Sequence, residues 1–154
     1  MPSNNKIETI LLYIKNTTLA GINAGTNYFT TPKIISREFK KPEETPEFPA
    51  LYIVKDKQTK IQQFTDIVDN KEYTRGVLSI IIIGYIQNKL NQDTEINKLY
   101  RDVEKIMLAD ITLGGNACFV EIKNVEFQQG ADIESNAFCW FKAFYEIIYE
   151  DKLN

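Results

Sequence analysis

The stretch from residue 136 to residue 150 is apolar on both of its alternating sides, and this constrains the fold more than any other part of the chain. A β-strand points successive side chains to opposite faces of its sheet. One parity is apolar throughout: Ala137, Cys139, Phe141, Ala143, Tyr145, Ile147 and Tyr149. The other holds Phe138, Trp140, Phe144 and Ile148, interrupted by Lys142, Glu146 and Glu150. Such a strand must be covered on both faces. We therefore predict a helix over one face and another element, such as a second protein subunit, over the other.

An amphipathic helix is predicted before this strand, with Asp93 as its N-cap. Its apolar side chains recur at helical spacing on one face: Ile96, Leu99, Tyr100, Val103, Ile106 and Met107. The opposite face is predicted to be solvated: Asn97, Lys98, Arg101, Asp102, Glu104 and Lys105. Gly114 and Gly115 allow the chain to reverse after the helix, because glycine adopts a positive φ easily. A strand starting at Cys118 is expected next, with a bulge or twist near Asn124.

The first half of the chain predicts one helix and three strands. The helix begins at Asn5, with Glu8 three residues later, and ends between residues 16 and 21. A long loop follows over residues 23–49, and loops of this length are usually functional or disordered. Strands are then predicted at 50–54 and 60–65, joined by a polar turn at 55–60. After a second turn at 66–71, a long β-branched strand covers 72–87 and bends at Gly76 or Gly84.

These elements predict a single α+β domain over residues 1–154, with a mainly antiparallel sheet and two helices packed on one face. A long, mobile loop at about residues 23–49 interrupts its N-terminal half. A chain of 154 residues that is 44% hydrophobic and 25% charged is typical of a soluble globular domain. Its longest aliphatic cluster, at 77–83, is too short to span a bilayer as a helix. With no secretory signal in view, we expect a protein made inside a cell, with no membrane partner.

The residue inventory argues against the familiar catalytic and cofactor sites. The chain has no histidine, which excludes Ser-His-Asp and Cys-His catalysis and histidine metal sites. It has no CxxC pair and no glycine-rich phosphate-binding string. The closest acidic pairs, such as Glu43 with Glu44 and Asp132 with Glu134, fall in predicted loops and are typical of solvated turns. We predict that the protein is not an enzyme and has no cofactor and no metal.

Several side chains allow more than one interpretation. Cys118 and Cys139 lie on adjacent predicted strands, and buried free thiols are favoured over a cross-strand disulfide. The formal charge of −3 gives no broad cationic field, although a local basic cluster exists in the long loop: Lys33, Arg37, Lys40 and Lys41. That cluster reads as a solvated loop or as part of a partner interface, together with Tyr28 and Phe29. Aromatic side chains of the last strand read as core, as a protein interface, or as a base-stacking platform: Phe138, Trp140 and Phe144. Nearby Glu146 and Glu150 argue against nucleic acid.

The residues of the C-terminal half carry a family resemblance. The segment INKLYRDVEKIMLADITLGGNACFVEIKNVEF, followed by a strand ending in KAFYEIIYED, resembles the C-terminal half of bacteriophage tail terminator (tail completion) proteins. A helix with the pattern of Leu99, Val103 and Ile106 leads into an Asp-x-Thr-Leu-Gly-Gly turn, here residues 110–115. The final strand carries the matching tyrosines Tyr145 and Tyr149. The first helix, the proline-led strand at 49–54 and the long strand from Tyr73 also fall in the expected order.

The resemblance implies a virion assembly protein. It implies a ring, usually a hexamer, that caps the tail tube, stops its polymerisation and offers a surface to the neck. The implied partners are copies of the chain itself, the tail tube protein, a neck or connector protein, and a sheath if the tail is contractile. DNA would pass through the ring without specific binding. The implied location is the virion, and the host cytoplasm during assembly. The long loop, with its charges and prolines, is expected to order on docking to tube or neck.

Other readings stay open at this point. A head-tail connector or stopper belongs to the same structural class, and only the short turn motif argues against it. A small carboxylate-based enzyme and a nucleic-acid-binding module come from other classes. A ring-sized particle in light scattering would count against the enzyme, and overlong tubes in the absence of the protein would separate a terminator from a stopper.

Overall fold

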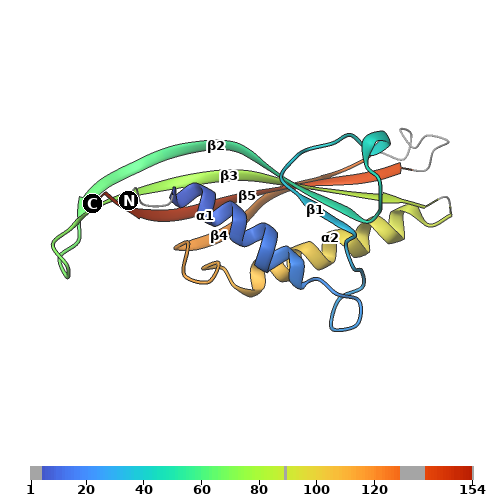
Figure 1. Ribbon diagram of the computed structural model, residues 1–154, viewed down its shortest axis with the longest axis horizontal. Helices are drawn as coiled ribbons and strands as arrows, with labels where there is room; N and C mark the ends of the chain where they lie inside the picture. The colour runs from blue at the N-terminus through green and yellow to red at the C-terminus, as the bar shows by residue number, and fades with distance from the viewer. Residues whose placement is uncertain (1–4, 89, 129–137, 154) are drawn as a thin grey trace.

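The computed structural model describes residues 5–88, 90–128 and 138–153, and it confirms the predicted α+β fold. The described strands form a five-stranded sheet in the order β1-β2-β3-β5-β4. Their bounds are Ile34–Ser36 (β1), Ala50–Thr65 (β2), Glu72–Gln87 (β3), Phe119–Phe127 (β4) and Phe138–Lys152 (β5). All neighbouring pairs are antiparallel except β1 with β2. The sheet is long and twisted, and the helices α1 (Lys6–Tyr13) and α2 (Gln92–Ala109) lie on one side of it (Figure 1).

The main core lies between the sheet and the helices. It joins side chains of α1, α2 and one face of β2, β3, β4 and β5 in a single buried cluster. Every described residue of the predicted inward parity of β5 belongs to it: Cys139, Phe141, Ala143, Tyr145, Ile147 and Tyr149. Ala137 lies outside the described residues. The apolar face predicted for α2 is also inside, with Leu99, Val103 and Met107 fully buried. Periodicity therefore predicted the core of this half correctly.

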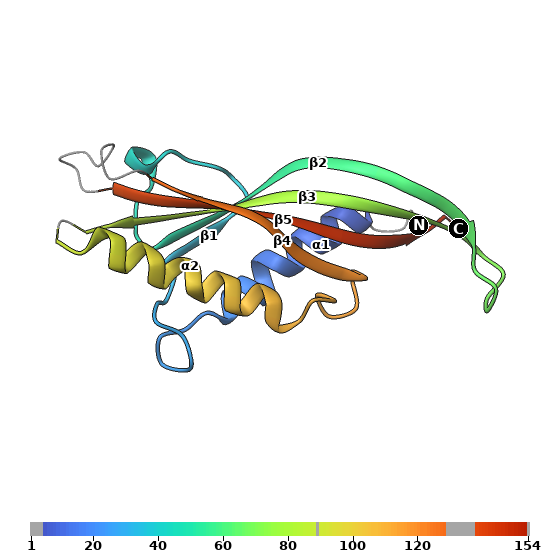
Figure 2. The same ribbon diagram turned by 180° about the vertical axis from the view of Figure 1, so that it is seen from behind.

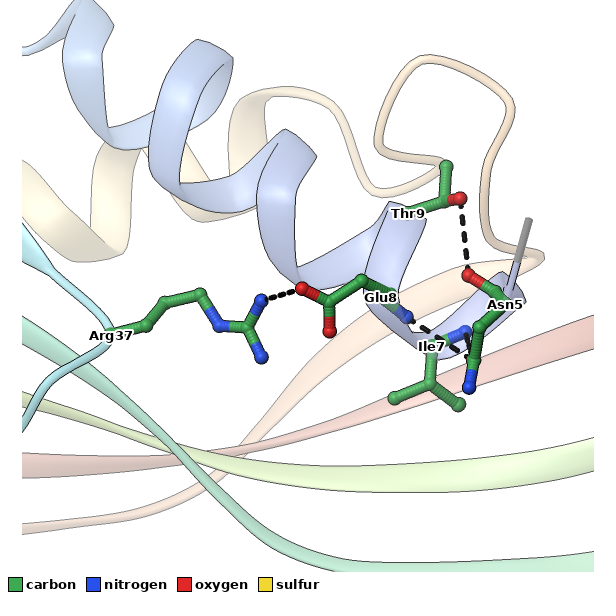
Figure 3. Close-up of polar contacts among 5 residues, drawn as sticks. All are labelled: Asn5, Ile7, Glu8, Thr9 and Arg37. Atoms are coloured by element: carbon green, nitrogen blue, oxygen red, sulfur yellow. Dashed lines mark hydrogen bonds and ion pairs between the residues drawn. The ribbon is translucent and has the colours of Figure 1, made fainter.

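Both helices begin close to the predicted positions. Asn5 caps α1, because its side-chain oxygen accepts from the backbone N–H groups of Ile7 at 2.9 Å and Glu8 at 3.4 Å. Figure 3 shows this cap and the Glu8 side chain, which turns away from it to pair with Arg37. A π-helical turn (Ile14–Thr18) and a 3-10 turn (Leu19–Gly21) continue the helix to the predicted end. The N-cap of α2 is Asn91, so the prediction of Asp93 was two residues late.

The predicted hairpin within residues 50–65 was wrong. The polar run at 55–60 does not turn; it continues as one strand, β2, that pairs with β3 along its full length. Register shifts at Lys55/Lys57 and Lys60/Gln62 absorb the break in alternation that resembled a turn. The turn at 66–71 was correct and joins β2 to β3. The predicted irregularity near Asn124 is confirmed as a register shift between Ile122 and Asn124.

The long loop contains structure that the sequence did not indicate. Ile34, Ile35 and Ser36 form β1, a short parallel strand beside Ala50, Leu51 and Tyr52. A 3-10 turn (Pro42–Glu44) follows, and the segment 37–49 passes over the face of the sheet opposite the helices. Among the described residues, no helix is long and apolar enough to cross a membrane.

Candidate interaction surfaces

The sheet face opposite the helices is covered at one end by the chain itself. Ala50, Tyr52, Ile83 and Tyr85 form a small second core there. Phe39 packs edge-on against Tyr52, with ring centroids 6.0 Å apart, and the Thr45 and Tyr52 hydroxyls hydrogen-bond at 2.9 Å. Residues 37–49, which we name the covering segment, therefore meet in part the expectation that another element covers this face, without a second subunit.

The remainder of that face carries a row of partly exposed apolar side chains, which we name the apolar strip. It crosses four strands in register and consists of Val54 of β2, Val77 and Ile81 of β3, Phe144 and Ile148 of β5, and Phe119 of β4. Phe119 is 36% exposed and the other five are half-buried. Continuous apolar surface of this kind on a folded chain is typical of a contact with another molecule.

Charged side chains border the apolar strip. A shallow cavity of about 300 Å³ lies along it, lined by Lys57 of β2, Phe144 and Glu146 of β5, and Lys123 and Glu126 of β4, among others. Lys123 pairs with Glu121, and this contact raises the pKa of the lysine. An apolar centre with a polar, charged border is the usual anatomy of a protein interface.

The three predicted interface aromatics of β5 lie on this face but do not share one environment. Phe138 stacks on Phe48 of the covering segment, with ring centroids 5.5 Å apart. Trp140 packs against the second core, and the Lys142 ammonium lies 5.0 Å from its ring centroid. Phe144 belongs to the apolar strip. The three rings therefore do not form a common stacking platform, and only Phe144 faces the uncovered region.

The basic cluster is split in the same way. Arg37 forms an ion pair with Glu8, which ties the start of the covering segment to α1 and lowers the pKa of the Glu8 carboxyl through the hydrogen bond (Figure 3). The backbone N–H of Lys33 donates to the Pro49 carbonyl at 2.8 Å, which holds the entry to β1. The side chains of Lys33, Lys40 and Lys41 are exposed. We assign Arg37 a positioning role and the three lysines to the solvated surface.

Tyr28 and Phe29, the other predicted interface residues, are held against α2 by a buried carboxylate. Asp102 is 1% exposed and accepts from the Phe29 N–H at 3.0 Å, the Thr30 N–H at 2.7 Å and the Thr30 hydroxyl at 2.6 Å. The prediction that Asp102 is solvated was wrong, because helical periodicity cannot show that a distant loop supplies three donors. Lys105 donates to the Asn27 carbonyl at 2.7 Å and lies over the Tyr28 ring.

The same anchor leaves the Phe29 ring 62% exposed beside α2. A groove of about 500 Å³ runs there, which we name the Phe29 groove; it is lined by Asn27, Phe29, Arg101, Asp102, Glu104, Lys105 and Leu108. Leu108 is 39% exposed. Hydrogen bonds to Asp102 thus hold the backbone at Phe29 while the ring is exposed to solvent, as an apolar contact residue would be.

The glycine turn that carries the family resemblance has a structural role. Asp110 accepts from the Thr112 hydroxyl at 2.8 Å and from the Gly114 N–H at 2.8 Å, and these bonds lower the pKa of its carboxyl. Gly114 and Gly115 have φ of +66° and +88°, as predicted. A side chain at Gly114 would meet the Tyr13 hydroxyl at 2.6 Å, so the turn closes tightly over the end of α1. This motif therefore packs the turn after α2 against the end of α1.

Among the described residues, no group of three or more histidine, cysteine, aspartate or glutamate side chains is placed so that it could hold a metal ion. Both cysteines are free thiols, so the disulfide alternative was wrong. Cys139 is buried as predicted, whereas Cys118 is exposed, so the prediction that its thiol is buried was wrong. Burial raises the pKa of the Cys139 thiol, and partial desolvation of the sulfur atom by neighbouring groups raises the pKa of the Cys118 thiol although the residue as a whole is exposed.

Comparison with protein-family models finds no match, and comparison with curated proteins finds none either.

Proposed function

We propose that the chain is a bacteriophage tail terminator, a virion assembly protein whose copies form a ring on the end of the tail tube. The observation that carries the proposal is the apolar strip: six side chains of four strands form a continuous, partly exposed surface next to the second core, against which Val54 and Ile81 pack. A neighbouring copy that packs on this strip would bury it. Burial of apolar surface contributes about 25 cal/mol per Å².

Two further features support an assembly role. The resemblance of residues 96–127 and 142–151 to tail terminators rests on a helix, a turn and two strands, and the fold places the helix in contact with both strands. In addition, exposed apolar residues occur on loops and turns at several sites, among them Phe29, Phe39 and Leu90. A protein that contacts a tube, a neck and its own neighbours needs several such surfaces. On this proposal the tail tube protein and a neck protein are its partners, and the virion is its location.

The first experiment tests ring formation through the apolar strip. The substitution Phe144→Asp places a charge in the strip on a half-buried side chain, and the fold can be verified by circular dichroism. We expect the wild-type chain to give a ring-sized mass in light scattering, at high concentration or on added tube, and the variant to lose it. Leu12→Asp is the matched control, since Leu12 is an exposed apolar residue on α1, in the helical layer. Equal assembly of Phe144→Asp and wild type would refute a role for the strip.

A further inference from the structure

The turn between β2 and β3 exposes two aliphatic side chains almost completely. Ile67 is 98% exposed and Val68 is 95% exposed, more than any other large apolar residue among those described. Turns favour Gly, Asn, Asp and Ser, so two adjacent β-branched aliphatic residues have no local reason to stand there. We name this pair the hairpin knob.

The hairpin knob sits on an ordered turn. The Asp66 N–H donates to the Lys71 carbonyl at 2.9 Å, and the Asn70 N–H donates to the Asp66 carbonyl at 2.8 Å. The Asp66 and Asp69 carboxylates accept from the N–H groups of Val68 at 2.8 Å and Lys71 at 3.0 Å. Because the backbone is already fixed, burying the knob against a partner costs little ordering entropy.

The Phe29 groove offers a complementary surface on the same chain. Its exposed apolar side chains are Phe29 and Leu108, and its volume of about 500 Å³ leaves room for two aliphatic side chains. It also carries two cations, Arg101 and Lys105, beside these apolar groups. An apolar pair flanked by acids would therefore meet an apolar groove that holds two bases and two acids, Asp102 and Glu104.

The charges at both surfaces support this match. At the knob, Asp66 and Asp69 stand directly beside the aliphatic pair, while Lys71 and Lys152 lie at the base of the turn. The hydrogen bond from Tyr73 lowers the pKa of Asp69, which keeps it ionised at neutral pH.

In the groove, the two carboxylates are already engaged. Glu104 pairs with Arg101 and accepts from the Tyr100 hydroxyl, and Asp102 accepts its three loop donors. The Lys105 ammonium donates to a neutral backbone carbonyl, so an incoming carboxylate would improve its pairing.

The positions of the two surfaces favour contact between different copies. The turn that carries the hairpin knob projects from the end of the sheet where β5 ends, and it bends toward the side of the helices (Figures 1 and 2). The Phe29 groove is lined mostly by residues of α2, and α2 lies along the other half of the sheet (Figure 2). Contacts between two different patches are head-to-tail and close into rings when the rotation allows.

We propose that the hairpin knob of one copy inserts into the Phe29 groove of the next copy, with Asp66 or Asp69 facing Lys105. This inference rests on the self-association of the proposed function and adds a second contact between neighbouring copies, beside the contact proposed for the apolar strip. The knob and the groove are two different patches, so the contact between copies is head-to-tail, unlike the contact in a two-fold dimer.

Cysteine cross-linking tests the contact directly. In full-length chains carrying Cys118→Ser, one preparation bears Ile67→Cys and a second, differently tagged, bears Leu108→Cys. We expect mild oxidation of the mixture to join one chain of each kind, and oxidation of either preparation alone to give no dimer. Cross-links within the Ile67→Cys preparation alone would show knob-to-knob contact and overturn the proposal, as would a mixture that stays uncross-linked.

Light scattering supplies the second readout. We expect Ile67→Asp with Val68→Asp to weaken self-association at least about tenfold. Phe29→Asp should match this loss, and combining the knob and groove changes should add little, because both remove the same contact. Leu12→Asp is the matched control, since Leu12 is 41% exposed on α1, outside the knob and the groove, and this variant should assemble normally.

The knob–groove contact and the proposed function can be refuted separately. If the variant with Ile67→Asp and Val68→Asp still formed rings of the wild-type mass, this contact would be overturned and the tail terminator proposal would stand. A wild-type chain that remains monomeric with and without tube ends would overturn the contact as well. Normal tail length without the protein would overturn the proposed function, whatever the cross-links show.

Discussion

Replacing Asp102 by asparagine tests the anchor that holds the Phe29 loop to α2. Asparagine keeps the shape of the side chain but removes its charge and turns an NH₂ group toward groups that also donate. The wild-type carboxylate accepts three hydrogen bonds, at 3.0, 2.7 and 2.6 Å. Hydrogen bonds to a charged group contribute about 1.5–3 kcal/mol each; the asparagine oxygen can retain at most the two bonds from Thr30, which then lose their charge assistance. Since the loop can open locally to hydrate the freed donors, we expect a net loss of about 3 kcal/mol.

Urea unfolding followed by circular dichroism measures this loss, and a domain of this size should lose roughly 10 °C in melting temperature. Glu104→Gln is the control on the same helix: its pairs with Arg101 and Tyr100 are at the surface, so the change should stay within about 0.5 kcal/mol. A proteolytic cut within residues 23–31 that speeds up in Asp102→Asn, and not in the control, would locate the effect in the loop. Wild-type stability of Asp102→Asn would refute the anchoring role.

Two further variants address the helical layer. Gly114→Ala should destabilise more than Gly115→Ala in urea unfolding: each strains a positive φ by about 1–2 kcal/mol, but only Gly114 has Tyr13 within 2.6 Å, which adds about 1–3 kcal/mol. Equal losses would mean that the turn is not closed over α1. Arg37→Met should make the free energy of unfolding depend less on pH at acidic pH. Because the pKa of Glu8 is lowered in the fold, its pairing with Arg37 stabilises the protein above about pH 4.5 and is lost as the pH falls through the lowered pKa. If the free energy of unfolding of Arg37→Met fell with decreasing pH as it does in the wild type, the stabilising role of the Glu8–Arg37 pair would be contradicted.

Local signals predicted the regular elements well where one periodicity dominates. The alternation of β5 placed Phe141, Tyr145 and Tyr149 inside, and the helical spacing of α2 placed Leu99 and Val103 beside them. These patterns work because burial follows directly from which face a side chain occupies.

The errors arose where the decisive partner is distant in sequence. β2 was divided into two short strands because its exposed half, from Lys55, is polar and carries register shifts; its pairing with β3 is what makes it one strand. β1 has only three residues and exists because Ala50 to Tyr52 offer it an edge. Asp102 resembles any polar residue of an exposed helix face until a loop more than seventy residues earlier supplies its donors.

The candidate surfaces follow the same division. Alternation showed that β5 is apolar on its outer face, and Phe144 does lie in the apolar strip. It could not show that residues 37–49 cover Phe138 and Trp140. The exposed pair Ile67 and Val68 was missed, although two aliphatic residues inside a polar turn were the available signal.

The central claim is that this chain ends a growing tail tube, and the length of tails assembled without it tests that claim most directly. Electron microscopy of lysates from a phage lacking the coding sequence should show tubes longer than the wild type and without heads, and the supplied protein should restore the normal length. Tails of normal length that merely fail to join heads would contradict the claim and identify a protein of the neck instead.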